Sequence, residues 1–128
     1  IYKLNNKEIH DPNIVKTLIN KKNKAIYFSR SAIPHLRGVK KEDWYKYYSY
    51  YGHVGIYGYR ADILLNWFSL GSSDLEESEK LEQLKLIDSG YYYDTFLVEE
   101  NNISIDTKKQ YLEAIDHFKN TINKSNWL

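Results

Sequence analysis

The stretch YYGHVGIYGYRAD, residues 50–62, combines regular glycine spacing with side chains that could bind a ligand. Glycine occupies every third position, at Gly52, Gly55 and Gly58. A phosphate-binding loop needs its glycines in a turn between a strand and a helix. Here the apolar residues Val54 and Ile56 alternate with other side chains, which is the pattern of a strand. We therefore interpret residues 53–59 as a strand and not as a phosphate loop.

In such a strand His53, Tyr57 and Tyr59 lie on one face, because side chains alternate with a period of two. The intervening glycines allow a ligand or another backbone to approach closely. One imidazole and two phenols could then exchange hydrogen bonds with a bound molecule. The alternative is that this face is solvated or contacts another subunit, and the spacing alone leaves both interpretations open.

A second group of polar side chains lies in LEESEKLEQLK, residues 75–85, which we expect to form a helix that ends at Gly90. Glu79, Glu82 and Gln83 are three and four residues apart and would share one helix face. Carboxylates and amides bind sugar hydroxyls with defined geometry. Solvated glutamates on a helix are commoner, so the ligand-binding interpretation needs further support.

Asp106 directly precedes Thr107, where the last helix is predicted to begin with capping-box spacing to Gln110. An aspartate at this place complements the helix dipole, which is the interpretation that the sequence favours. The same carboxylate could instead bind a hard cation such as Mg²⁺.

The elements that must position these residues alternate between strands and helices. The runs NIVKTLI and AIYF flank the polar turn NKKNK and predict a hairpin. A loop or short helix is expected from Ser29 to Gly52, a helix at RADILLNWFSL and a strand at YYYDTFLV. The pattern indicates an α/β chain. Its three or four strands are too few for a complete parallel sheet, so we expect something else to complete it.

The composition of the 128 residues is that of a globular domain, with 42% hydrophobic and 27% charged side chains. The 18 basic and 17 acidic side chains nearly cancel, which argues against a nucleic-acid or membrane partner. The sequence has no cysteine and no apolar run long enough to cross a bilayer, so we expect a cytoplasmic protein. The lack of methionine, even at position 1, suggests a segment of a longer polypeptide.

Five successive motifs resemble those of one family, the 3-deoxy-manno-octulosonate (Kdo) cytidylyltransferases, or CMP-Kdo synthetases. The motifs are DPNIVK, AIYFSRSAIPHLR, GHVGIYGYRADIL, LEESEKLEQLKLIDSG and SIDTKKQYLEAI, and together they cover nearly the whole chain. The resemblance implies the C-terminal half of a nucleotide-diphospho-sugar transferase domain, which is a Rossmann-like α/β fold with a mixed sheet. It also implies that CTP binds to the N-terminal half, which is absent from these 128 residues, and that the acid sugar binds to this half.

The same resemblance implies roles for individual residues. Arg37 of IPHLR matches a partner of the sugar carboxylate, a task suited to the forked guanidinium. The positions that would line the sugar pocket are His53, Tyr57, Glu82 and Gln83. Asp106 of IDT matches a catalytic magnesium ligand, and the metal would lower the pKa of the attacking sugar hydroxyl. Ser104 and Lys108 depart from the family's usual glycine and proline around this motif, so its loop is expected to differ in shape.

The function implied by the resemblance is the coupling of CTP to Kdo or a related acid sugar, giving a CMP-sugar and pyrophosphate for lipopolysaccharide or capsule synthesis. Residues 1–128 would form the sugar-binding and dimerisation portion of the enzyme and would be inactive alone. A homodimer contact is expected at residues 44–51 and 29–38, where aromatic side chains gather. The alternative is a non-enzymatic binding or assembly module that uses its tyrosine-rich surface.

Overall fold

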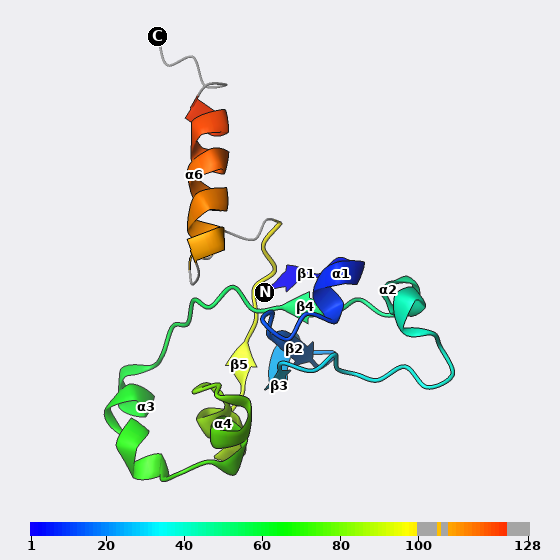
Figure 1. The fold of residues 1–128 in the computed structure, drawn as a ribbon. Helices are drawn as coiled ribbons and strands as arrows, with labels where there is room; N and C mark the ends of the chain where they lie inside the picture. The colour runs from blue at the N-terminus through cyan, green and yellow to red at the C-terminus, as the bar shows by residue number, and fades with distance from the viewer. Residues whose placement is uncertain (100–104, 106–107, 123–128) are drawn as a thin grey trace.

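The computed structural model of the chain describes residues 1–99, 105 and 108–122 (Figure 1). Asp106 and the predicted helix-capping residue Thr107 lie outside the described residues. No helix in the described part is both long and apolar enough to cross a membrane.

A five-stranded sheet forms the centre of the chain, with the strand order β1-β4-β2-β3-β5. The strands are β1 (Tyr2–Lys3), β2 (Lys16–Ile19), β3 (Lys24–Ser29), β4 (Tyr51–Gly52) and β5 (Tyr93–Asp94). All pairings among the described residues are antiparallel. The predicted hairpin is therefore confirmed as β2 and β3. The sheet in this part of the fold is antiparallel, whereas a mixed sheet was expected of the complete domain.

The turn of the hairpin follows from its asparagines. Asn23 adopts the left-handed conformation, with φ of 55°, which asparagine tolerates better than most residues. The side chain of Asn20 accepts hydrogen bonds from the backbone N–H groups of Lys22 (2.8 Å) and Lys24 (3.2 Å). The turn thus satisfies its own backbone donors and brings the two apolar runs into register.

The predicted strand over residues 53–59 is wrong. Only Tyr51 and Gly52 pair in the sheet, and the chain then continues without regular structure to Arg60. Gly55 has φ of 84°, a conformation that breaks the extended path a strand requires. The strand expected at YYYDTFLV is likewise shorter, since only β5 pairs.

The helices are short except for the last. They are α1 (Asn6–Ile9), η1 (Lys41–Asp43), α2 (Trp44–Tyr47), α3 (Ala61–Leu65), η2 (Trp67–Leu70), α4 (Asp74–Glu79), α5 (Leu84–Asp88) and α6 (Lys108–Ile122). The single helix predicted over residues 75–90 is wrong, because Lys80 takes a left-handed conformation (φ 53°) and ends α4. A turn follows, and Glu82 and Gln83 lie in it.

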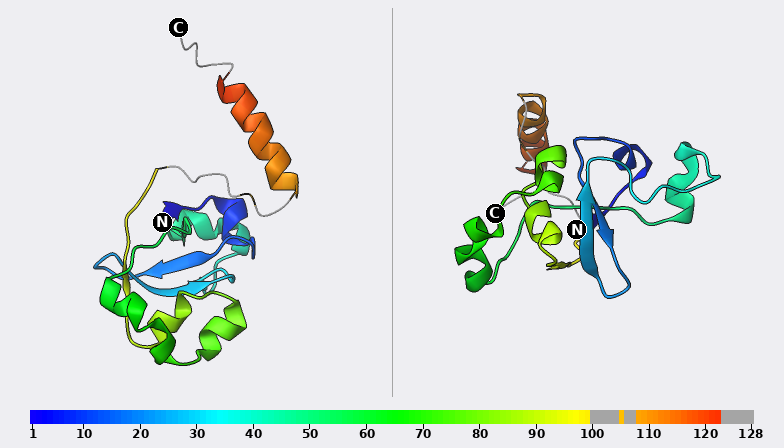
Figure 2. Two further views of the ribbon diagram at one scale, coloured as in Figure 1. Left: turned by 90° about the vertical axis from the view of Figure 1, so that its left-hand side faces the viewer. Right: turned by 90° about the horizontal axis from the view of Figure 1, so that it is seen from below.

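Two groups of helices flank the sheet, with α1 and α2 on one side and α3 to α5 on the other, of which α3 lies farthest from the strands (Figure 2). Each side has its own apolar cluster. The first contains Tyr2, Leu4, Ile9, Trp44 and Tyr50, and the second contains Val15, Ala25, Phe28, Leu81 and Leu84. Helix α6 stands apart from both groups (Figures 1 and 2).

The tyrosine-rich segment after Lys40 is less exposed than the sequence suggested. Trp44 and Tyr50 belong to the core, with 2% and 1% of their surface exposed, and their rings stack 6.0 Å apart. The Tyr50 hydroxyl donates to the carbonyl of Pro34 (2.6 Å). Tyr45 and Tyr47 remain exposed, so the aromatic surface available there is smaller than expected.

Gly52 tests how tightly the first cluster is packed. A Cβ at this position would lie 2.8 Å from side-chain atoms of both Tyr2 and Leu4, too close to be accommodated without movement. We expect Gly52→Ala to lower the free energy of unfolding by about 1–3 kcal/mol, measured by urea denaturation. Gly58→Ala is the control, because nothing lies within 4 Å of a Cβ there. Equal stability of the two variants would contradict this packing.

Candidate functional site

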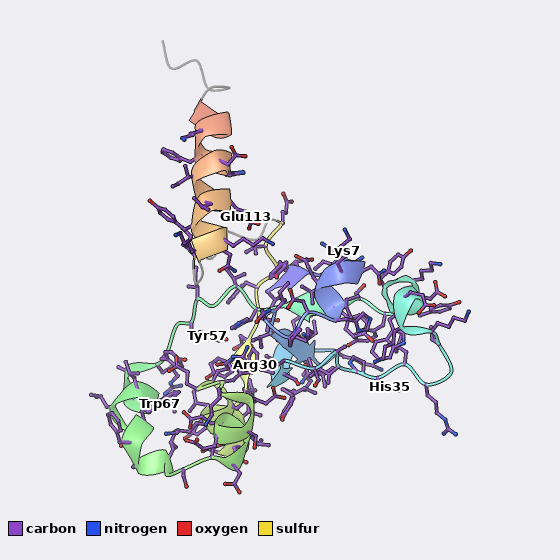
Figure 3. The ribbon with its side chains drawn as sticks, viewed as in Figure 1. Lys7, Arg30, His35, Tyr57, Trp67 and Glu113 are labelled. Carbon is purple, nitrogen blue, oxygen red and sulfur yellow. The ribbon has the colours of Figure 1, made fainter. Side chains whose placement is uncertain are left out.

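A cavity of about 980 Å³ lies beside the sheet, between residues 53–63 and residues 90–98. His53, Tyr57, Tyr59, Arg60 and Tyr93 are among the side chains that line it. Figure 3 shows Tyr57 between the strands and α3. A concave site with aromatic walls and a few polar groups is typical of small-molecule binding.

His53 enters the cavity directly after β4, an interior strand of the sheet. Its backbone N–H donates to the carbonyl of Val15 (3.1 Å), just before β2 begins, so the sheet fixes the position of His53. Its Nδ1 atom lies 2.6 Å from the hydroxyl of Tyr57. The predicted pair therefore does meet, although a loop and not a strand brings the two side chains together.

Burial sets the protonation of this pair. It lowers the pKa of His53, with a smaller contribution from the positive charge of Arg30. Burial also raises the pKa of Tyr57, assisted by the charges of Tyr59 and Glu82. The imidazole is therefore neutral at pH 7 and the phenol stays protonated. When the Tyr57 hydroxyl donates to Nδ1, the Nε2–H of His53 is the donor left for a ligand.

Three tyrosine rings form a cluster around this pair. The ring centroid of Tyr57 lies 6.2 Å from that of Tyr59 and 5.5 Å from that of Tyr93, and Tyr59 and Tyr93 are 6.1 Å apart. Phe28 packs edge-on beneath Tyr57 and Tyr93. Tyr59 shares the predicted face with Tyr57 but is not among the residues that the family resemblance implies, and Tyr93 was not predicted, because its only signal in the sequence is the run YYY.

Glu82 lies next to the tyrosine cluster. With Tyr59 and Trp67 it lines a smaller adjoining cavity of about 360 Å³. Its charge also contributes to the raised pKa of Tyr57 and of Tyr93, for both of which burial is the main cause. The structure thus brings a carboxylate to the edge of the larger cavity, beside the tyrosines.

Gln83 is almost fully buried, with 3% of its surface exposed. Its backbone carbonyl accepts a hydrogen bond from the Tyr93 hydroxyl (3.3 Å). Its side-chain Nε2 is buried without a hydrogen-bond partner. Such a donor is costly to leave unpaired and is usually explained by a bound group or water. Four of the sequence-predicted residues, His53, Tyr57, Glu82 and Gln83, therefore gather around Tyr59 and Tyr93.

Arg37 is not brought to this group. It is exposed in the loop after β3, and its neighbour Leu36 packs against the cluster that contains Trp44. Figure 3 shows His35, in the same loop, on the opposite side of the strands from Tyr57. Arg37 has no hydrogen-bond or ion-pair partner among the described residues, so its role in sugar binding stays a prediction.

No three histidine, aspartate or glutamate side chains of the described residues gather in a way that could hold a metal ion. The predicted magnesium ligand Asp106 lies outside the described residues. The described part of the chain therefore supplies no metal site of its own, and the magnesium prediction depends on Asp106 together with groups from elsewhere.

Comparison with known proteins identifies the family. A family model described as cytidylyltransferase matches residues 3–113. The chain belongs to the cytidylyltransferase family. This membership favours the enzyme over the binding-module alternative, and it confirms the resemblance seen in the five motifs.

Relatives of this cytidylyltransferase chain are longer than it is. The 3-deoxy-manno-octulosonate cytidylyltransferase of Parabacteroides distasonis is 39% identical over 112 residues, which are 88% of this chain and 45% of that protein. The enzyme of the same name from Leptospira interrogans is 42% identical over 118 residues, 92% of this chain and 43% of the relative. The chain thus spans less than half the length of these curated relatives.

A solved structure supports the same assignment of fold. CMP:2-keto-3-deoxy-manno-octonic acid synthetase complexed with CTP matches with a TM-score of 0.80 and 35% sequence identity. The match covers 94% of this chain and 47% of that one. The cytidylyltransferase chain therefore has the fold of one part of that enzyme, as predicted.

The partly buried His53 predicts a loss of stability in acid. Its pKa is lower in the folded than in the unfolded chain, so the unfolded chain binds more protons below about pH 6.5. Stability should fall as the pH drops from about 6.5 through the folded-state pKa. We expect the melting temperature of His53→Gln to fall less between pH 7.5 and pH 5.5 than that of the parent chain. His35→Gln, at an exposed histidine, is the control. If the melting temperature of His53→Gln fell as much in acid as that of the parent, His53 would not be the cause of the acid sensitivity.

Proposed function

We propose that the complete polypeptide transfers the cytidylyl group of CTP to Kdo or a related acid sugar, with release of pyrophosphate, for lipopolysaccharide or capsule synthesis. The observation that carries this proposal is the match of 94% of the chain to a CMP-Kdo synthetase solved with CTP, at 35% identity. Relatives with the same activity in their names are about 40% identical.

The part played by this chain is to bind the acid sugar. The Nε2–H of His53 is an available donor, the carboxylate of Glu82 is an acceptor beside Tyr59, and the backbone carbonyl of Gln83 holds the Tyr93 hydroxyl. The rings of Tyr57 and Tyr59 offer apolar faces to the C–H groups of a sugar. This combination of donors, acceptors and flat apolar surfaces suits a hydroxyl-rich ligand.

Two further residues are proposed to take part, although the loop of Arg37 lies on the other side of the strands from Tyr57 and Asp106 lies outside the described residues. The exposed guanidinium of Arg37 would bind the sugar carboxylate with two parallel hydrogen bonds. Asp106 would be a ligand of Mg²⁺, and the metal would make the sugar hydroxyl a better nucleophile toward the α-phosphate of CTP. The N-terminal part found in the relatives would bind CTP.

We also propose that the enzyme works as a cytoplasmic homodimer. The support is the exposed apolar surface that the chain retains, which includes Phe68 at 92%, Leu65 at 83% and Phe96 at 79%. The segments that we predicted as the dimer contact contribute Tyr45 and Tyr47 to it. Light scattering of the complete polypeptide at micromolar concentration measures its oligomeric state directly.

In the proposed function this chain binds the acid sugar and the N-terminal part binds CTP, and this can be tested directly. The complete polypeptide should release pyrophosphate from CTP only when Kdo or a related acid sugar is present. Residues 1–128 alone should release none, because the nucleotide-binding part is needed to hold CTP. A coupled pyrophosphate assay of both proteins measures this. Family-like turnover by residues 1–128 alone, or no turnover by the complete polypeptide with any acid sugar, would overturn the proposal.

Asp106 and Arg37 should fail in different ways when they are replaced in the complete polypeptide. Asp106→Asn removes a ligand charge but retains the size and capping ability of the side chain, so turnover should fall by about 10²-fold or more with little change in thermal stability. Arg37→Lys retains the charge but loses the paired hydrogen bonds, so mainly the KM for the acid sugar should rise, about tenfold.

The control for Arg37 is Arg60, which lines the cavity but is already paired with Asp62 through two hydrogen bonds of 3.1 and 3.0 Å. Steady-state kinetics with both substrates varied should show little effect of Arg60→Lys. A larger rise in the sugar KM for Arg60→Lys than for Arg37→Lys would move the carboxylate contact to Arg60. Near-normal turnover of Asp106→Asn would contradict the proposal that Asp106 is a ligand of Mg²⁺.

A further inference from the structure

The carboxylate of Glu79 is fully engaged inside the protein. Its Oε1 accepts a hydrogen bond from the Ser29 hydroxyl (2.5 Å), and its Oε2 accepts one from the backbone N–H of Arg30 (2.9 Å). The backbone carbonyl of Glu79 accepts a third bond from Nε of Arg30 (2.9 Å). The expectation that Glu79 faces a ligand together with Glu82 and Gln83 is therefore wrong, because its oxygens are occupied and the helix breaks after it.

These bonds join two elements that are far apart in the sequence. Ser29 is the last residue of β3 and only 2% of its surface is exposed, whereas Glu79 is the last residue of α4. Figure 3 shows Arg30 between the strands and α4. Arg30 is also held from the other side, since its Nη1 donates to the carbonyl of Pro12 (3.3 Å). The end of α4 is thus fixed to the end of a central strand.

The turn that carries Glu82 and Gln83 begins directly after this attachment. Lys80 turns the chain away from α4, and the turn closes with bonds from the Leu84 N–H to the Leu81 carbonyl (3.0 Å) and from the Lys85 N–H to the Glu82 carbonyl (3.2 Å). Helix α4 has only six residues and would not be stable alone. The position of the turn therefore depends on contacts with the sheet.

Two kinds of contact with the sheet can fix the position of this turn. Leu81 and Leu84 pack into the cluster around Phe28, which holds the turn near the sheet but is not directional. The bonds to Glu79 are directional, and a carboxylate acceptor makes two of them charge-assisted. Buried Lys16 faces the same place, as the register partner of Ser29, and its Nζ is held by the carbonyls of Asp11 and Ile14.

We propose that Glu79 is a positioning residue for the acid sugar, because it holds Glu82 and Gln83 at the place where they meet the Tyr57–Tyr93 side of the cavity. This inference rests on the proposed function only for the identity of the ligand, an acid sugar. The claim that Glu79 fixes the position of the turn does not depend on that function. Glu79 touches neither the sugar nor CTP and acts through the two residues that follow it.

The test replaces Glu79 in the complete polypeptide and measures kinetics with CTP and the acid sugar. Glu79→Ala should raise the KM for the acid sugar about tenfold, as expected when charge-assisted hydrogen bonds are lost, and leave the KM for CTP unchanged. Glu79→Gln should recover part of the affinity, since its amide oxygen can still accept from the Arg30 N–H. Glu77→Ala is the matched control, because Glu77 on the same helix is exposed and pairs only with Lys80 among the described residues.

Hydrogen exchange separates this inference from the proposed function. The amides of Leu84 and Lys85, whose bonds close the turn, should exchange faster in Glu79→Ala than in the parent and in Glu77→Ala. If the parent enzyme transfers nothing to any acid sugar, the proposed function fails, and faster exchange would still support the positioning role. Unchanged exchange, or a Glu79→Ala variant whose KM rises equally for both substrates, would overturn the positioning role.

Discussion

The antiparallel pairing of β2 with β3 is the constraint on which the rest of the chain depends. One edge of β2 pairs with Gly52 of β4, and the His53 N–H bonds the carbonyl that precedes β2. The far edge of β3 pairs with β5, where Ala25 lies opposite Tyr93. The end of β3 holds Glu79 through Ser29. Each segment that contributes to the cavity is therefore attached to this one hairpin, and its register sets their mutual distances.

Local chemistry explains what the sequence could predict. The hairpin follows from asparagines that satisfy their own turn, and these contacts span only a few residues. His53 and Tyr57 were predicted to share one strand face, where residues four apart lie about 13 Å apart, whereas the loop brings their side chains into direct contact. The pattern of alternation could not reveal that Gly55 breaks the strand, because glycine permits both conformations.

Tertiary contacts explain what the sequence could not predict. Residues 75–90 have helical spacing, but Leu81 and Leu84 must both reach Phe28 while Glu79 reaches Ser29. A continuous helix does not meet both demands here, and the break at Lys80 resolves the conflict. Tyr93 was missed for a similar reason. Its place beside Tyr57 depends on β5 pairing with a strand about seventy residues earlier, and no local pattern records that pairing.

The protonation states of the cavity have a consequence for how an anion is recognised. Its histidine is neutral at pH 7, its partly buried tyrosines keep their protons, and its charged side chains Arg60 and Asp94 are paired with Asp62 and Lys24. Toward the acid sugar that we propose as ligand, these lining groups would discriminate by hydrogen-bond geometry and shape. The charge of a ligand must be matched by groups beyond the lining. In the proposed function, selectivity for the hydroxyl pattern of the sugar and attraction of its negative charge are thus assigned to separate parts of the molecule, and salt should weaken the second much more than the first.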